Sequence, residues 1–217
     1  ESWGDLYKLK DLESVFDSPT YRTWNGLRDV EDSRNVCLTL PRFLLRAPYG
    51  PQNEIADFDY EENAVEGDDL CWGNAAFALA TRVVDSFAKY RWCPNIIGPK
   101  SGGAVTGLPS YVYDRDGKFF VAGPVEIPIS DRREYEFSNL GFAPLTLRKG
   151  TDNASFFSAN SIQKTKFFGS DAEAKQAELN YKLGTQLPYL FVVTRLAHYL
   201  KVLQRENLGG WVSRGEI

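Results

Sequence analysis

Residues 36–51, VCLTLPRFLLRAPYGP, decide how the chain is organised. The run over residues 36–40 is short, apolar and closed by Pro41, a pattern that predicts a buried strand. Three prolines and a glycine within residues 41–51 then predict a loop, because proline cannot donate to a strand ladder and glycine favours turns. We therefore expect one central strand here, followed by a surface loop.

A helix is expected upstream of this strand, over residues 19–31. Ser18 and Pro19 match an N-cap followed by proline at the first helical position, where the missing N–H costs nothing. One face would carry three apolar side chains at spacings of three residues: Tyr21, Trp24 and Leu27. Arg28 would then lie at the edge of that face or in solvent.

The clearest helix lies downstream, from about residue 69 to residue 92, with Asp68 or Asp69 as its N-cap. Its expected buried face consists of apolar side chains at spacings of three and four: Trp72, Ala76, Leu79, Val83, Phe87 and Tyr90. A hairpin follows, because apolar runs at 111–113 and 118–121 flank a turn rich in Asp and Gly.

Shorter elements fill the second half of the chain. We expect a short helix over residues 130–137 and two strands over 143–147 and 154–157. A further helix starts after Ser170, with Glu173 in the position of a capping box.

Pro188 then restarts or kinks this last helix. Beyond it the chain is apolar at a regular set of positions: 189, 193, 196, 200 and 203. Helices and strands interleave without an internal repeat or a long linker. This order favours an α/β (mixed α+β) fold, a mixed sheet flanked by helices, in a single domain over residues 1–217.

Composition excludes several classes of protein. The chain has 217 residues, of which 43% are hydrophobic and 25% charged, values typical of a globular protein with a sizeable core. A net charge of −4 gives no general attraction to nucleic acid or anionic lipid. No stretch reaches 18 uncharged apolar residues, so we expect no membrane insertion. The chain starts at Glu1 and contains no Met, which indicates a piece of a longer protein.

The charges are unevenly distributed. Residues 1–70 hold 7 basic and 16 acidic side chains, a net charge of −9. Most of the excess is one acidic run without any Lys or Arg: Glu54, Asp57, Asp59, Glu61, Glu62, Glu66, Asp68 and Asp69. The run is either a solvated loop or a contact surface for a basic partner. A calcium loop is the least favoured alternative, because Glu62 stands where its sharp turn needs Gly.

Catalytic patterns are weak. His198, the only histidine, would share a basic helical stripe and has no nucleophile or orienting acid beside it in sequence. The pairs Glu61-Glu62 and Asp68-Asp69 could serve glycoside hydrolysis, but neighbouring side chains usually point apart. We therefore expect no catalytic residue.

Metal, cofactor and phosphate sites are not indicated either. The spacing of Cys37, Cys71 and Cys93 matches no zinc site, and we expect three free, buried thiols in a reducing compartment. Residues 98–103, GPKSGG, lack the glycines that a phosphate loop requires, and we expect a flexible connector there. Lysines and aromatic residues mix in residues 163–168, QKTKFF, although an acidic chain argues against a nucleic-acid platform.

Residues 36–50 resemble the "LTLPR…LLRLPYG" segment of the large sheath subunit of the bacterial type VI secretion system, the TssC, VipB or EvpB family. Further blocks resemble the same family, in its order and over most of the chain: residues 16–19 (FDSP), 31–34 (EDSR), 71–78 (CWGNAAFA), 87–93 (FAKYRWC), 130–134 (SDRRE), 140–145 (LGFAPL), 161–164 (SIQK), 187–190 (LPYL) and 195–201 (RLAHYLK). Together these blocks are highly specific.

The resemblance implies a structural component of a contractile sheath in the bacterial cytoplasm, with the fold of the family's middle domain. It implies a small sheath subunit (TssB/VipA-like) as partner, further copies of the same chain, an inner tube protein, and a ClpV-type AAA+ ATPase that recycles the contracted sheath. The family has no catalytic residues and no cofactor. Its chain extends beyond both ends of this one, so we expect no tubules from this fragment alone.

Two other functions stay open at this stage. One is the sheath of a phage or a related contractile particle, and the other is a stand-alone carboxylate-dependent hydrolase that would use Glu61 or Glu62. For a sheath, an acidic patch on one copy would meet a basic patch on the next. Glu61 and Glu62 on one side, and Lys164 and Lys166 on the other, are the candidate contact residues.

Overall fold

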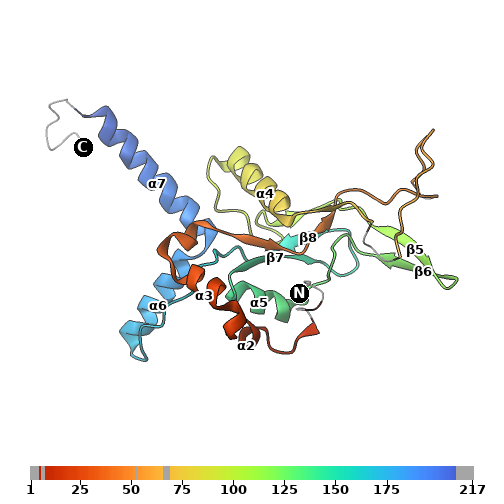
Figure 1. The fold of residues 1–217 in the computed structure, drawn as a ribbon. Helices are drawn as coiled ribbons and strands as arrows, with labels where there is room; N and C mark the ends of the chain where they lie inside the picture. The colour runs from red at the N-terminus through yellow and green to blue at the C-terminus, as the bar shows by residue number, and fades with distance from the viewer. Residues whose placement is uncertain (1–4, 6–7, 52, 66–68, 209–217) are drawn as a thin grey trace.

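The computed structural model describes residues 5, 8–51, 53–65 and 69–208 (Figure 1). A four-stranded mixed sheet with the strand order β1-β7-β8-β4 lies at its centre. Strand β1 (Leu38–Leu40) runs parallel to β7 (Phe142–Leu147). Strand β8 (Ala154–Phe156) is antiparallel to both β7 and β4 (Ala104–Val105). The mixed sheet and its strands near residues 36–40, 143–147 and 154–157 confirm the prediction.

Helices cover the two faces of this sheet. In Figure 1, α4 (Ala75–Tyr90) lies above the strands, and the smaller helices lie below them. The smaller helices are α2 (Leu12–Phe16), α3 (Arg22–Asp29) with a 3₁₀ turn on each side of it (Pro19–Tyr21 and Glu31–Asn35), and α5 (Asp131–Asn139). The helix expected over residues 19–31 is therefore confirmed as a 3₁₀ turn that leads into α3.

Two apolar clusters occupy these two layers. The first joins α4 to the sheet through buried residues such as Leu79, Leu145 and Phe156. The second joins α2 and α5 to the sheet through Phe16, Phe137 and Phe142, with Trp24 packed against its edge. Phe142 and Leu145 lie on opposite faces of β7, as the alternation of side chains along a strand requires.

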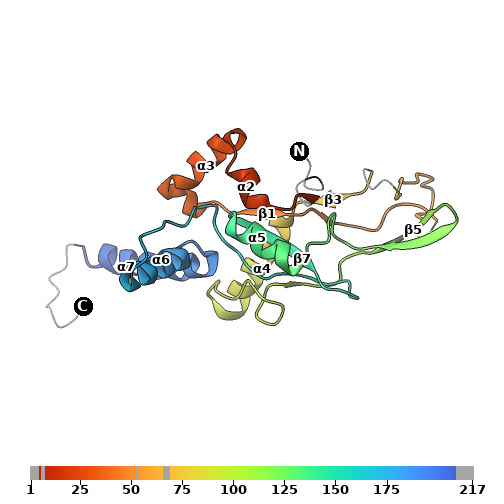
Figure 2. The ribbon, with the colours of Figure 1, turned by 90° about the horizontal axis from the view of Figure 1, so that it is seen from below.

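The remaining elements mark the two ends of the molecule. Helices α6 (Ala172–Gly184) and α7 (Leu187–Glu206) lie at one end, and the hairpin β5–β6 (Tyr111–Arg115 and Lys118–Ala122) projects from the other (Figures 1 and 2). The hairpin was predicted from its turn. Asp116 and Gly117 both have positive φ, 54° and 74°, which matches the two-residue turn that suits twisted strands.

The start of α4 differs from the prediction. The helix begins at Ala75, and its N-cap is Asn74, whose Oδ1 accepts from the N–H of Ala76 at 2.8 Å. Asp69 lies in a turn before the helix, and Asp68 lies outside the described residues. Trp72 forms strand β3 (Trp72–Gly73), which pairs with β2 (Phe43–Leu44) instead of joining the helix.

The buried face of α4 was predicted only in part, since Leu79 is buried and Val83 packs against the first apolar cluster as expected. Small residues face the sheet beside Leu79, namely Ala75, Ala78 and Ser86. Phe87 and Tyr90, expected inside, are exposed together with Phe77 and Val84. Apolar side chains occupy more than one side of this helix, so their spacing alone could not select the face that packs on the sheet.

Three local predictions need correction. The capping box is absent, because α6 starts after Asp171, which makes no side-chain cap bond. The connector over residues 98–103 closes tightly against β8: Gly98 donates to the carbonyl of Phe156 at 2.7 Å, and Phe156 donates to that of Gly103 at 3.0 Å. Arg28 is buried, 4% exposed, because its guanidinium donates to backbone carbonyls of distant segments.

Candidate interaction sites

Glu62, one of the candidate contact residues, lies inside the protein. Its side chain is 4% exposed, and its Oε1 accepts from Nη2 of Arg46 at 2.6 Å. Its Oε2 accepts from Nη1 of Arg46 at 2.8 Å and from the N–H of Tyr49 at 3.0 Å. The hydrogen bonds from Arg46 hold the pKa of Glu62 below its usual range. Glu62 therefore anchors the acidic loop, whose described part is residues 53–65, to the segment that carries Arg46 and Tyr49. Its neighbour Glu61 is exposed.

The loop that Glu62 anchors carries an aromatic cluster. The ring of Tyr49 lies 5.1 Å from that of Phe58 and 6.5 Å from that of Tyr60. The guanidinium of Arg46 lies 3.7 Å from the centre of the Tyr49 ring, a cation–π contact that adds to its ion pair with Glu62. These contacts hold a segment without regular secondary structure in one conformation.

A cleft of about 660 Å³ separates this loop from the hairpin. One wall includes Tyr49, Glu61 and Val65, and the other is strand β5 from Tyr111 to Asp114. Phe119, which is 76% exposed, reaches the cleft from β6. Among the described residues that line the cleft there is no Lys or Arg, whereas Glu61, Glu62 and Asp114 are present.

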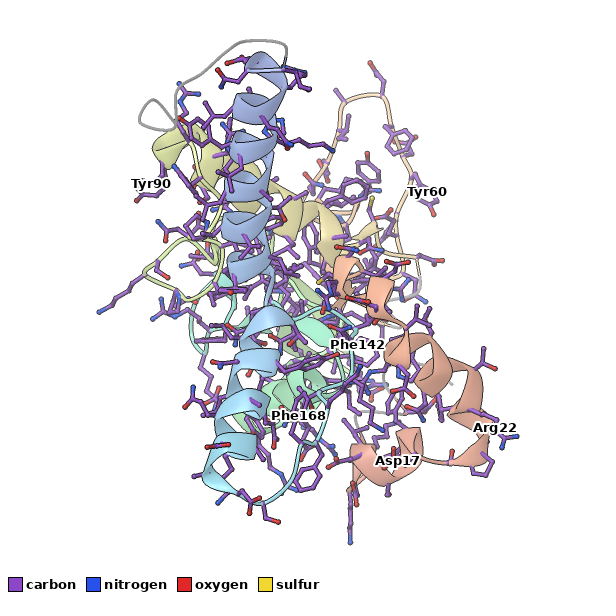
Figure 3. The ribbon with its side chains drawn as sticks, turned by 90° about the vertical axis from the view of Figure 1, so that its left-hand side faces the viewer. Asp17, Arg22, Tyr60, Tyr90, Phe142 and Phe168 are labelled. Atoms are coloured by element: carbon purple, nitrogen blue, oxygen red, sulfur yellow. The ribbon has the colours of Figure 1, made fainter. Side chains whose placement is uncertain are left out.

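Lys164 and Lys166 lie at the opposite end of the molecule from the acidic loop. Figure 3 looks at the end that carries α6 and α7, and it shows Phe168 beside α6 and Tyr60 out on the acidic loop. Nζ of Lys166 lies 5.6 Å from the ring centre of Tyr181 on α6, and the Phe168 ring meets the same Tyr181 edge-on at 5.8 Å. Within one copy the structure does not bring the acidic and basic candidates together.

Helix α7 carries the apolar positions that the sequence marked, and they face solvent. Tyr189, Val193, Leu196, Leu200 and Leu203 are all exposed. Only the start of the helix is anchored, because Leu187 belongs to the first apolar cluster and Leu190 and Phe191 pack against it. The rest of α7 extends away from the sheet (Figure 1). A stripe of five exposed apolar side chains along one helix is typical of a surface that another segment covers.

The catalytic candidates remain isolated. His198 is exposed on α7. Within the described part of the chain, no group of three or more His, Cys, Asp or Glu residues could hold a metal ion. The three cysteines are free, but they are half-buried and not fully buried as predicted. Burial raises the pKa of Cys37 to about 12. Among the described helices, none is long and apolar enough to cross a membrane.

Comparison with known families accounts for most of the sequence. Residues 1–163 match the family model described as EvpB/VC_A0108, tail sheath N-terminal domain. The chain belongs to this tail sheath family. Residues 176–217 match a second model, the EvpB/VC_A0108 tail sheath gpW/gp25-like domain, which includes most of α6 and all of α7. The resemblance inferred from the sequence blocks is thereby confirmed.

A curated member of the tail sheath family shows the same relationship. The type VI secretion system sheath protein TssC1 of Pseudomonas aeruginosa is 40% identical over 220 residues. The alignment covers 100% of this chain and 43% of TssC1. The chain therefore spans less than half the length of this relative.

The features that sequence reasoning missed depend on tertiary contacts. The Arg46–Glu62 ion pair joins residues 16 positions apart across a loop, and no local pattern marks it. The cleft beside β5 is formed by two segments that are far apart in sequence. The consecutive large side chains at 111–113 and 119–121 were the available sign that both faces of this hairpin carry large side chains.

Proposed function

We propose that the chain is part of a structural subunit of the type VI secretion contractile sheath. Copies of the full-length subunit polymerise around an inner tube, and contraction of the sheath drives the tube and its effectors into a target cell. The observation that carries this proposal is the match of two tail sheath models, in order, to residues 1–163 and 176–217. The 40% identity to a type VI sheath protein selects this secretion system over a phage tail.

The surface of the chain supports a role in assembly. Helices α4 and α7 each expose several large apolar side chains, and a subunit of a larger particle covers such surfaces with its neighbours. The partners of the proposal are a small sheath subunit, further copies of the chain, an inner tube protein and a ClpV-type ATPase, all in the bacterial cytoplasm. The proposed role requires no catalytic residue and no cofactor.

A hydrolase using Glu61 or Glu62 is not favoured. A general acid or nucleophile must be free to meet its substrate. Both carboxylate oxygens of Glu62 accept hydrogen bonds from Arg46, and Glu61 lies in an exposed loop. We therefore assign these acids to structure and contacts.

Assembly of the full-length subunit tests the proposal. The full-length protein would be produced with a small sheath subunit and examined by electron microscopy. We expect the two to co-purify and to form hollow, striated tubules. The 217-residue chain, mixed with the same small subunit, should form none. A full-length protein that stays monomeric beside its partner would contradict the proposal.

A further inference from the structure

The cleft between the acidic loop and β5 has the form of a site for an added strand. The hairpin β5–β6 is a separate two-stranded sheet, so among the described residues β5 pairs with β6 alone. The two-residue turn makes Arg115 and Lys118 a hydrogen-bonded pair. Hydrogen-bonded and non-hydrogen-bonded pairs then alternate along the ladder, and Asp114 and Val112 belong to the non-hydrogen-bonded pairs. The backbone N–H and C=O of Val112 and Asp114 therefore point away from β6, on the strand that lines the cleft.

The chemistry of the cleft selects a basic and aromatic ligand. Its walls combine the exposed carboxylates of Glu61 and Asp114 with the apolar surfaces of Tyr49, Val65 and Phe119. Because no Lys or Arg of the described residues lines the cleft, Lys side chains of a bound segment would pair with its carboxylates without competition from those residues. An open strand edge supplies the main-chain hydrogen bonds, and pockets beside it select the side chains.

Residues 164–168, KTKFF, have the matching chemistry. This segment lies in no helix or strand, and the backbone groups of residues 165–168 make no hydrogen bond within the described part of the chain. Both lysines are exposed, and Phe167 is 78% exposed. Lys166 and Phe168 both contact Tyr181 of α6, whereas most of the Phe167 side chain is open to solvent.

The cleft beside β5 and residues 164–168 lie at opposite ends of one molecule, so they can meet only between two molecules. Figures 1 and 2 both place β5 at the end opposite α6, which directly follows the segment. We propose that residues 164–168 of one copy add as a strand to the β5 edge of a second copy, within the cleft that the acidic loop closes. This contact deepens the sheath assignment and rests on it. Because the two surfaces differ, the contact is head-to-tail and extends a row of copies instead of closing a symmetric dimer.

Cross-linking between copies of the 217-residue chain tests this contact. A photo-activated phenylalanine analogue at Phe119 would be irradiated in a concentrated mixture of isotope-labelled and unlabelled chain. We expect mass spectrometry to find mixed-isotope cross-links from position 119 to residues 161–169. The same analogue at Phe77, which is 70% exposed on α4, is the matched control and should not reach that segment.

Charge reversal checks the specificity of the contact. The chain with Lys164→Glu, Lys166→Glu and Phe167→Ser should give about tenfold less of this cross-link, because it loses two ion pairs and one apolar side chain. A chain with Glu61→Lys should also lose yield, and mixing it with the Lys164→Glu, Lys166→Glu chain should restore part of it. All these side chains are exposed, and circular dichroism would confirm that the variants fold.

Other outcomes would overturn the proposal. Cross-links from position 119 to α7, to other surfaces, or only within one copy would exclude residues 164–168 as the occupant. In the full-length sheath the same analogue should again reach this segment, and a cross-link to the small subunit would exclude it. Tubules that form normally from the triple variant would remove this contact while leaving the sheath assignment intact. If the unsubstituted full-length protein formed no tubules with its small subunit, that result would instead count against the sheath assignment, because cross-linking of the 217-residue chain is measured separately.

Discussion

The Nε of Arg28 donates to the carbonyl oxygen of Ile162 at 2.8 Å, and the carbonyl of Arg28 accepts from the N–H of Lys164 at 3.0 Å. A second guanidinium nitrogen, Nη2, donates to the carbonyl of Asn139 at 3.1 Å. Burial lowers the pKa of Arg28, and no carboxylate forms an ion pair with it within the described part of the chain. Through these hydrogen bonds, helix α3 holds in place the backbone at Ile162 and Lys164, where residues 164–168 begin.

Replacement of Arg28 should destabilise the fold. In Arg28→Ala the buried carbonyl of Ile162 and the partly buried carbonyl of Asn139 lose their donor, and we expect the free energy of unfolding to fall by about 3 kcal/mol. Urea denaturation followed by tryptophan fluorescence would measure it. Arg22→Ala, an exposed change on the same helix, is the control and should stay within about 0.5 kcal/mol of the parent. Equal effects of the two changes would show that the carbonyl contacts contribute nothing.

The ion pair of Glu62 should make stability depend on pH. The folded pKa of Glu62 lies below the unfolded one, so its contribution is present at neutral pH and is lost as the pH falls through the folded pKa. Glu62→Gln should cost about 2 kcal/mol at pH 7, and the difference from the parent should shrink below about pH 4. Glu61→Gln, which changes an exposed side chain of the same loop, is the matched control in urea denaturation and should stay within about 0.5 kcal/mol of the parent at pH 7. A deficit for Glu62→Gln that is constant over this range would refute the assignment.

Cys37 should resist alkylation in the folded chain. Its pKa of about 12, against 9.0 for an ordinary thiol, reduces the reactive thiolate on the order of a thousandfold at neutral pH. Iodoacetamide labelling at neutral pH, followed by mass spectrometry, should modify Cys37 far more slowly in buffer than in urea. Labelling of Cys37 at the same rate in both solvents would mean that the thiol is not held inside the fold.

Two glycine substitutions should have opposite effects. A Cβ at Gly103 would lie 2.6 Å from the carbonyl oxygen of Phe156, so Gly103→Ala must displace backbone and should cost about 2 kcal/mol or more. A Cβ at Gly26 meets nothing within 4 Å, and alanine favours the helix there, so Gly26→Ala should stabilise the chain by about 0.5–1 kcal/mol. Thermal unfolding would separate the two. A rise in melting temperature for both would contradict the close packing of residues 98–103 on β8.

The apolar stripe on α7 should govern association more than folding. Leu196→Lys with Leu200→Lys removes exposed side chains, so the unfolding free energy should change by less than about 1 kcal/mol. Sedimentation velocity should show less self-association of the 217-residue chain. In the full-length protein the same pair should prevent tubule formation. Normal tubules from this variant would mean that the stripe stays uncovered in the sheath.

Local signals predicted the elements that depend on local chemistry. The hairpin was found because the turn residues Asp116 and Gly117 tolerate positive φ, and α7 was found because Pro188 marks its first turn. The start of α4 was missed because Trp72 pairs with Leu44 in a two-stranded sheet, and the local sequence around Trp72 does not reveal that distant partner. The burial of Arg28 depends on carbonyls at positions 139 and 162, which only the assembled fold brings within reach.

The candidate contact residues were only partly accessible to sequence reasoning. The excess of acids between residues 54 and 69 marked a segment whose described part, residues 53–65, is a loop. Charge alone could not separate Glu61 from Glu62, because the difference arises from Arg46 on the far side of that loop. Whether Glu61, Lys164 and Lys166 meet between copies stays a prediction, to be tested by the cross-linking and charge-reversal experiments.

The parallel pairing of β1 with β7 also has a consequence for biosynthesis. Leu38 pairs with Phe142, so β1 has no partner until the ribosome has also made β7. At about 5–20 residues per second, β1 waits on the order of 5 to 20 s while the intervening residues are synthesised. The acidic run follows β1 closely in sequence, and its charge would repel other nascent chains of the same kind during this interval. The loop would then protect the newborn subunit before it takes part in any assembly.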